Sequence, residues 1–358
     1  MDEKQIAAKR KYAGERRASM KRRDDYHDYA GRRMYMITLE VEGRLPLFGR
    51  LMGDAFASVG SKNGPRIELT ELGKAVQREW LGIHDYYPQI EVKAVQMMPD
   101  HLHGILFVKE PLPVHLGQVI SGFKAGCRKA QRALEAAQEA AAKPLPTEKE
   151  ALASQQATAL PLQVIASPSQ GSRPYHPLFA KGYNDLILRS YDELPIWLNY
   201  LRDNPRRLLM KHACPQRLRP FFGLVIGSHS YCGIGNRDLL VAPKRKAVRL
   251  SRRLNDSEIE AEVVKYLAMA KDGVVLVSPA ISPGEKRVMR AIFDAGFPTI
   301  VLMENGFTSL SKPHGEQFYA CAEGRLLMLS PFEHHNERKK ITASQCQQLN
   351  LMALEICE

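Results

Sequence analysis

The sequence lacks the features that mark a secreted or membrane-spanning protein. No apolar run approaches the length of a transmembrane helix, and the charged N-terminus has no apolar core of the kind found in a signal peptide. The six cysteines are scattered, and no two of them form a Cys-x-x-Cys pair. This spacing argues against a zinc knuckle and a disulfide framework, so we expect reduced thiols in a cytoplasmic protein with no membrane partner.

The chain also has too few acidic residues to balance its basic ones. Against 51 Lys and Arg it has 39 Asp and Glu, which gives a net charge of +12 over 358 residues. This excess predicts a polyanionic partner. We expect nucleic acid rather than a membrane surface, because no basic amphipathic helix with an aromatic face stands out.

Composition divides the chain into an arm and two domains. Residues 1–33 carry basic clusters with few large apolar residues, which predicts an N-terminal arm that is either a solvated tail or a phosphate contact. Residues 34–215 and 216–358 are each long enough to bury a core. Within the first domain, the Ala-, Gln-, Ser- and Pro-rich residues 135–172 have no apolar period and predict a flexible insertion that begins as a helix.

The first domain alternates strand and helix patterns. Residues 35–41 (YMITLEV) alternate as a strand does, and 70–81 and 114–134 carry apolar residues at helical spacing. With strands expected at 90–97 and from 101 onward, the order predicts an α+β fold, an antiparallel sheet with helices on it. A further helix is expected from 191, with a capping box at Ser190, and it should end near Asn204, before Pro205.

The second domain alternates buried strands with helices, which predicts a parallel, Rossmann-like α/β sheet. Its small-residue stretch 227–235 is expected to be a turn. Such sheets place ligands at the carboxyl ends of their strands, and serines and backbone amides there could hold a nucleotide phosphate. A G-x-G-x-x-G fingerprint is lacking, so no cofactor-binding residue is assigned, and a degenerate scaffold that binds DNA or a protein partner is the equal alternative. The expected strands and helices lie at 273–277, 299–303 and 326–329, and at 259–270, 283–295 and 343–357.

The most specific piece of chemistry is a His-x-His triplet inside an apolar run, Met98–Val108 (MPDHLHGILFV). Side chains alternate along a strand, so His101 and His103 share one face while Leu102 packs behind them. Two imidazoles on one strand make half of a divalent metal site. A lone His-x-His is common, however, and needs a third ligand and a reactive group from elsewhere in the chain.

Tyr200 and Asn204 stand four residues apart and therefore lie on one helix face. A tyrosine can attack a phosphodiester, and an amide oxygen is a hard ligand suited to Mg²⁺ or Mn²⁺. On spacing alone, a core aromatic of an amphipathic helix is the better explanation of Tyr200.

Four segments together resemble the REP-associated tyrosine transposase group of the single-tyrosine HUH transposases. They are MPDHLHGILFV, the upstream YMITLEVEGRLPLFG, the helix containing GFKAGCRKA, and the downstream KGYNDLILR…YLRDNPRR, over roughly residues 34–212. The resemblance implies an HUH fold, with a ferredoxin-like antiparallel sheet. It also implies cutting and rejoining of single-stranded, hairpin-containing DNA through a covalent 5′-phosphotyrosine.

The same resemblance implies the roles of individual residues. His101 and His103 would be metal ligands, Asn204 the third ligand for Mg²⁺ or Mn²⁺, and Tyr200 the nucleophile. Tyr183, in the shared GYNDLILR segment, is the rival nucleophile, but only Tyr200 has an amide four residues on. Asp100 replaces the Asn more usual before the first histidine, and we expect little effect because it is not a ligand. The residues expected to contact the DNA backbone are Lys124, Arg128 and Lys129.

The second domain, in VSPAISPGEK…IVLMENGF…GRLLMLSP, faintly resembles the Rossmann-like domain of the DNA-processing protein A family. The sequence thus predicts a metal-dependent, single-strand DNA transposase-like transesterase. The alternative is a non-cleaving DNA-binding or nucleotide-sensing protein that keeps the HUH frame. A second copy of the chain, as a homodimer, and a nucleotide bound by the second domain are the further partners considered.

Overall fold

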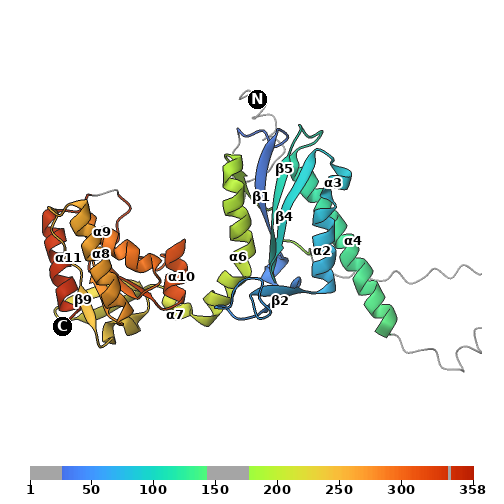
Figure 1. Ribbon diagram of the computed structural model, residues 1–358. Coiled ribbons are helices and arrows are strands. Elements are labelled where there is room, and N and C mark those ends of the chain that lie inside the picture. Colours follow the sequence, from blue (N-terminus) through green and yellow to red (C-terminus); the bar gives the residue numbers. More distant parts are fainter. Residues whose placement is uncertain (1–25, 143–176, 338–339) are drawn as a thin grey trace, which may run out of the picture. The chain divides into compact units, whose positions relative to one another are not determined.

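The computed structural model describes residues 26–142, 177–337 and 340–358 (Figure 1). The chain divides into two compact units, Met1–Arg206 and Arg207–Glu358, where the sequence placed the boundary after 215. Most of the predicted basic arm and of the predicted insertion lies outside the described residues. The first residues of that insertion, 135–142, form the end of a helix, as expected.

The first unit is built on a four-stranded antiparallel sheet in the order β4-β5-β1-β6, which confirms the predicted antiparallel α+β arrangement. A separate hairpin of two short strands lies between β1 and the first long helix. The strands are β1 (Arg33–Glu40), β2 (Gly49–Met52), β3 (Arg66–Leu69), β4 (Ile90–Met97), β5 (His101–Val108) and β6 (Asn184–Leu188).

Helices cover both faces of this sheet. The main core lies under α2 and α4, where Trp80 and Phe123 pack against the buried side chains of β1 and β5. On the other face, α6 packs Leu194 and Leu201 against Ile105 and its neighbours. Period-2 alternation in β1 and β5 supplies both faces with apolar residues. The helical segments are η1 (Glu42–Arg44), α2 (Glu71–Leu81), α3 (Ile83–Tyr86), α4 (Leu116–Ala142), η2 (Tyr191–Glu193) and α6 (Leu194–Ala213).

The expectation that the helix after residue 191 ends near Asn204 is wrong. α6 continues through Pro205 to Ala213. Proline removes one backbone N–H and so one hydrogen bond to the preceding turn, but a helix held by packing on either side can tolerate that loss.

The second unit contains a six-stranded sheet in the order β7-β8-β12-β11-β10-β9. The predicted parallel pairing is confirmed for β10, β11 and β12, and β9, which lies in a basic stretch not predicted as a strand, pairs parallel with β10. The predicted turn at 227–235 is wrong, because His229–Gly235 forms β8, antiparallel to both β7 and β12. The strands are β7 (Phe221–Ile226), β8 (His229–Gly235), β9 (Arg245–Ala247), β10 (Val275–Ser278), β11 (Thr299–Leu302) and β12 (Leu326–Ser330).

Two cores flank the second sheet. One packs α8 and α9 against β10, and the other packs α11 against β8, β10, β11 and β12. Three of the helices begin with capping boxes, at Asn255, Ser282 and Thr342, which explains why they start where they do. The helical segments are α7 (Pro215–Leu218), η3 (Arg237–Val241), α8 (Asp256–Lys271), α9 (Pro283–Asp294), α10 (Glu316–Ala322) and α11 (Ala343–Glu355).

Two further expectations concern the cysteines and membrane-spanning helices. All six cysteines lie in the described residues, and each is a free thiol. No helix in the described part of the chain combines the length and the apolarity that crossing a membrane requires.

Gly104 lies between His103 and Ile105, where a Cβ atom would sit 2.1 Å from Cζ2 of the fully buried Trp80. We therefore expect Gly104→Ala to lower the free energy of unfolding of the first unit by about 1–3 kcal/mol, the usual effect of overpacking a core. Gly122→Ala in α4 is the matched control, since nothing lies within 4 Å of its Cβ position. There, alanine should be neutral or stabilise by up to about 1 kcal/mol.

Urea unfolding followed by tryptophan fluorescence measures both variants. The chain has two tryptophans, Trp80 and Trp197, and both belong to the first unit, so the signal reports that unit alone. A Gly104→Ala variant as stable as the unmodified chain would contradict the packing of β5 on α2.

Candidate functional site

His101 and His103 lie on the face of β5 that is turned away from α2 and α4. Their ring centroids are 4.8 Å apart and their planes are nearly perpendicular, while Leu102 between them is fully buried in the main core. The register with β1 places Thr38 opposite His103 and Glu40 opposite His101. The structure thus brings the two predicted ligands together on one face.

A hydrogen bond fixes each imidazole at its Nδ1 atom. His101 Nδ1 lies 2.6 Å from Oδ1 of Asp100, and His103 Nδ1 lies 2.8 Å from the Thr38 hydroxyl. Neither Nε2 atom makes a hydrogen bond to any described residue. Metal-binding histidines commonly use one ring nitrogen for such a partner and the other for the metal.

Burial lowers the pKa of both imidazoles. For His103 the pKa falls to about 3, because burial disfavours the charged ring and the neighbouring His101 and Arg44 oppose a positive charge. For His101 burial also dominates, but the bond to Asp100 opposes the shift. Both rings are therefore neutral at pH 7, which is the form that binds a metal.

α6 brings Tyr200 next to His103. The centroids of these two rings are 6.3 Å apart, and Trp197 flanks the tyrosine at 5.7 Å. Tyr200 is 38% exposed, so it is not buried as a core aromatic would be.

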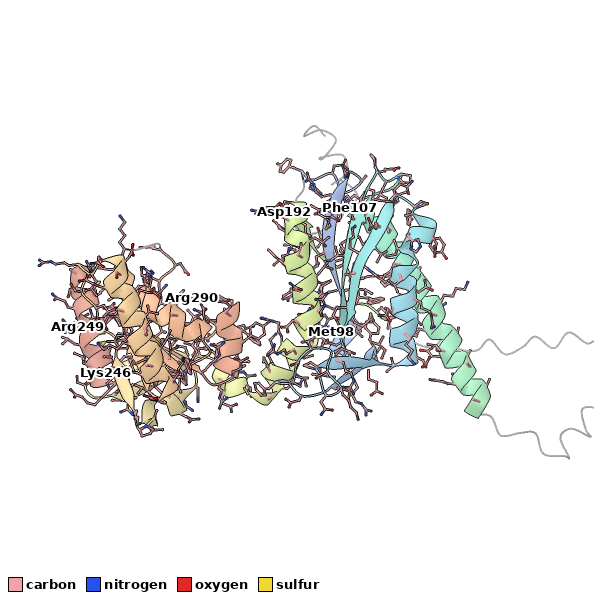
Figure 2. All side chains as sticks on the ribbon, viewed as in Figure 1. Met98, Phe107, Asp192, Lys246, Arg249 and Arg290 are labelled. Carbon is pink, nitrogen blue, oxygen red and sulfur yellow. The ribbon has the colours of Figure 1, made fainter. Side chains whose placement is uncertain are left out.

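Tyr200 and His103 come together because β5 and α6 run in opposite directions. Phe107 and Asp192 lie at the same end of the sheet and Met98 at the other, so the strand and the helix run antiparallel (Figure 2). Four strand residues separate Phe107 from His103, and each rises about 3.3 Å. The ring of Tyr191 lies against that of Phe107, so these two residues mark the same level. Nine residues, most of them helical with a rise of about 1.5 Å, separate Tyr191 from Tyr200. Both distances are about 13 Å, so the two side chains arrive at the same level.

By the same arithmetic we expect Asn204 to lie level with His101. One helical turn beyond Tyr200 is about 6 Å, and two strand residues beyond His103 are about 6.6 Å. The Asn204 side chain is buried, and its Nδ2 atom has no hydrogen-bond partner among the described residues. A buried N–H donor without a partner is costly in a fold, and a ligand that supplies a hydrogen-bond acceptor would remove that cost.

These residues offer donors that would suit part of a metal site. Within residues 26–142, 177–337 and 340–358, no group of three or more His, Cys, Asp or Glu side chains is arranged to bind a metal. Two imidazole nitrogens and one amide oxygen fit a divalent cation whose other positions hold water and phosphate oxygens. The donor set therefore fits Mg²⁺ or Mn²⁺ bound together with a phosphodiester.

The structure places the rival Tyr183 elsewhere. Its ring packs against the core under α4, on the face of the sheet opposite the histidines, and its hydroxyl is buried. It lines a cavity of about 760 Å³ between α4 and residues 177–183. Of the two tyrosines, only Tyr200 faces the imidazoles.

The three predicted DNA contacts all lie on α4, which covers the face of the sheet opposite the histidines. Lys124 donates hydrogen bonds to the carbonyl oxygens of Ala180 and Gly182, so its ammonium holds the segment that leads into β6. Arg128 lines the same cavity, and Lys129 is exposed.

Sequence reasoning missed three residues around the histidines. Thr38 could have been found, since its alternation along β1 places it on the histidine face. Asp100, which we expected to matter little, bonds His101. Arg44 reaches back from the turn after β1 to Oδ2 of Asp100, at 3.0 Å, and to Glu40, at 2.9 Å. No spacing rule predicts that contact, because it depends on a turn with positive φ.

In the second unit the serines at the predicted ligand edge serve the fold. Ser278 is fully buried and donates to the carbonyl of Val248, and Ser282 caps α9. The buried carboxylate of Glu285 accepts hydrogen bonds from the N–H groups of Leu250, Ile281 and Ser282. These hydroxyls and amides thus already have hydrogen-bond partners within the fold.

No family model matches the chain. It is similar to an uncharacterized protein of Haemophilus influenzae, with 26% identity over 121 residues; the match covers 28% of this chain and 61% of that protein. Solved structures with limited similarity are DNA processing protein A from Helicobacter pylori and a REP-associated tyrosine transposase bound to a REP hairpin. The first has 17% identity and a TM-score of 0.30 over 40% of this chain and 67% of that one. The second has 11% identity and a TM-score of 0.29 over 51% and 73%.

Burial keeps His103 neutral in the folded chain. At mildly acidic pH the unfolded chain therefore binds a proton at this residue and the folded chain does not. The unfolded pKa is about 6.5 and the folded pKa is about 3, so stability is complete above pH 6.5 and falls as the pH is lowered toward 3. Lowering the pH from 7 to 5 should therefore reduce the free energy of unfolding by about 2 kcal/mol through His103.

Urea unfolding at both pH values, with tryptophan fluorescence, tests this effect against His103→Gln. The variant cannot take up the proton, so it should lose about 2 kcal/mol less than the unmodified chain. Equal losses in the two proteins would mean that His103 is not buried as described.

Proposed function

We propose that this protein cleaves and rejoins single-stranded DNA through a covalent bond between Tyr200 and a 5′ phosphate. The observation that carries the proposal is the contact of Tyr200 with the neutral imidazole of His103, which lies beside that of His101, while neither Nε2 atom bonds a described residue. His101, His103 and the Asn204 amide oxygen would hold Mg²⁺ or Mn²⁺. When bound, such an ion neutralises charge on the scissile phosphate and orients it.

The chain's own residues then account for the bond changes. The Tyr200 phenolic oxygen attacks phosphorus, the bond from phosphorus to the 3′ oxygen breaks, and that oxygen leaves as a hydroxyl after gaining a proton. The phenol proton passes to solvent, since Tyr200 is partly exposed. In rejoining, a 3′ hydroxyl attacks the phosphotyrosine and releases Tyr200. Trp197 and His103 confine the phenol ring between them, which limits its loss of freedom on reaction.

Charge supports a DNA substrate. The net charge of +12 attracts a polyanion, and Arg128 and Lys129 would contact the backbone of a hairpin-containing strand from α4. Lys124 supports that surface through its bonds to the 180–182 segment.

A non-cleaving protein that binds DNA or a nucleotide is the alternative function. The absence of a third His, Cys, Asp or Glu ligand beside His101 and His103, within the described ranges, is the observation in its favour. The two functions differ in one product, the covalent adduct, which only the cleaving enzyme forms.

Incubation of the full chain with Mn²⁺ and end-labelled single-stranded hairpin DNA should give a labelled adduct on a denaturing gel. Tyr200→Phe should abolish it, because phenylalanine has no oxygen to attack phosphorus. Tyr191→Phe is the matched control: Tyr191 is 59% exposed and lies at the far end of the same sheet face, so its adduct should equal that of the unmodified chain.

Tyr183→Phe separates the rival assignment. An adduct that persists in Tyr200→Phe and disappears in Tyr183→Phe would overturn the choice of nucleophile. Binding of the hairpin without an adduct, across several hairpin sequences, would favour the non-cleaving function.

A further inference from the structure

We infer that Asp100 is a positioning residue that makes His101 a metal ligand, and that Arg44 holds Asp100 in place for this task. The inference rests on the proposed function, since it concerns the same site. It assigns a role to the residue that stands immediately before the His-x-His triplet, and its basis is the pattern of bonds around that triplet.

The chemistry of the Asp100 contact fixes the proton on His101. An ionised carboxylate can only accept hydrogen bonds, so the Nδ1 atom at 2.6 Å must carry the hydrogen. In the neutral imidazole the lone pair then resides on Nε2 alone. Asp100 therefore selects the one tautomer in which Nε2 can bind a cation, and it raises the basicity of that nitrogen.

The partner of His103 does not impose this choice. The Thr38 hydroxyl can donate to Nδ1 or accept from it, so either tautomer of His103 satisfies the bond. The two ligands are thus unequal, and His101 is the one with a fixed lone pair.

Arg44 completes the arrangement by occupying the other carboxylate oxygen. Its Nε lies 3.0 Å from Oδ2 of Asp100, and its guanidinium also reaches Glu40 at 2.9 Å. Arg44 takes a backbone φ of 57°, which is unusual for a residue with a side chain, directly after Gly43 at 68°. This turn directs the guanidinium back over the end of β1, toward Asp100.

At this position the main chain of Asp100, rather than its side chain, makes the hydrogen bonds that stabilise the fold. Its carbonyl accepts a hydrogen bond from the N–H of Val41, and the neighbouring Met98 N–H bonds the carbonyl of His101. Both bonds survive a change of side chain, and the Asp100 side chain is 22% exposed. Substitutions there should therefore leave the fold intact and act on His101.

Mn²⁺ titration of the full chain, followed by the electron paramagnetic resonance signal of the free ion, tests the inference. Asp100→Ala should weaken Mn²⁺ binding about 10- to 100-fold, as loss of a ligand's hydrogen-bond partner does elsewhere. Asp100→Asn should recover most of that loss, because the amide oxygen still accepts from Nδ1. Glu42→Gln is the matched control for the loss of one nearby negative charge, since exposed Glu42 does not contact the histidines, and its binding should be unchanged.

A second measurement needs no metal at all. The ¹⁵N chemical shifts of the His101 ring should show hydrogen on Nδ1 in the unmodified chain and in Asp100→Asn, and a mixture of tautomers in Asp100→Ala. A purely structural role of Asp100 would alter the unfolding curve without moving these shifts.

The outcomes separate the two proposals. If the unmodified chain and His101→Ala bind Mn²⁺ equally weakly, the metal site of the proposed function fails. If the unmodified chain binds and His101→Ala does not, but Asp100→Ala behaves as Glu42→Gln does, the metal site stands and the positioning role of Asp100 is overturned.

Discussion

The pairing of β5 with β1 is the constraint on which the candidate site depends. Their antiparallel register sets His103 opposite Thr38 and His101 opposite Glu40, while Leu102 and Leu39 point into the main core. A slip of one residue would exchange the two faces, burying imidazoles under α2 and exposing leucines. The large apolar area under α2 and α4 therefore specifies the position of the histidines. Only one register buries the leucines there and leaves the histidines on the other face.

The other half of the site depends on the packing of α6. Leu194 and Leu201 anchor this helix to the sheet, and its antiparallel course relative to β5 makes rise along the helix match rise along the strand. Tyr200 on α6 consequently contacts His103 on β5. In the proposed function the strand supplies rigid ligands, and the helix supplies a nucleophile whose level is set by packing elsewhere along α6.

Much of this arrangement could be predicted from the sequence, and the remainder could not for identifiable reasons. Alternation in 35–41 and 101–108 reveals the paired strands and the shared face of the histidines, because period 2 is a local property. β8 was missed because its glycines, serine and histidine resemble a turn, and only pairing with β12 makes it a strand. The contact of Arg44 with Asp100 depends on backbone torsions and a long side chain, which leave no trace in residue spacing.

The way Lys124 holds the segment before β6 has a consequence for the stability of the chain. Its two hydrogen bonds, the bridge of Val41 with Phe179 and the bond from Ala180 N–H to the Glu40 carbonyl fix the entry to β6 independently of what joins it to α4. Closing a connection costs only about 0.6 kcal/mol more for each doubling of its length. A change in the number of residues between Ala142 and Pro177 would therefore alter the free energy of unfolding by little, because these contacts form without them.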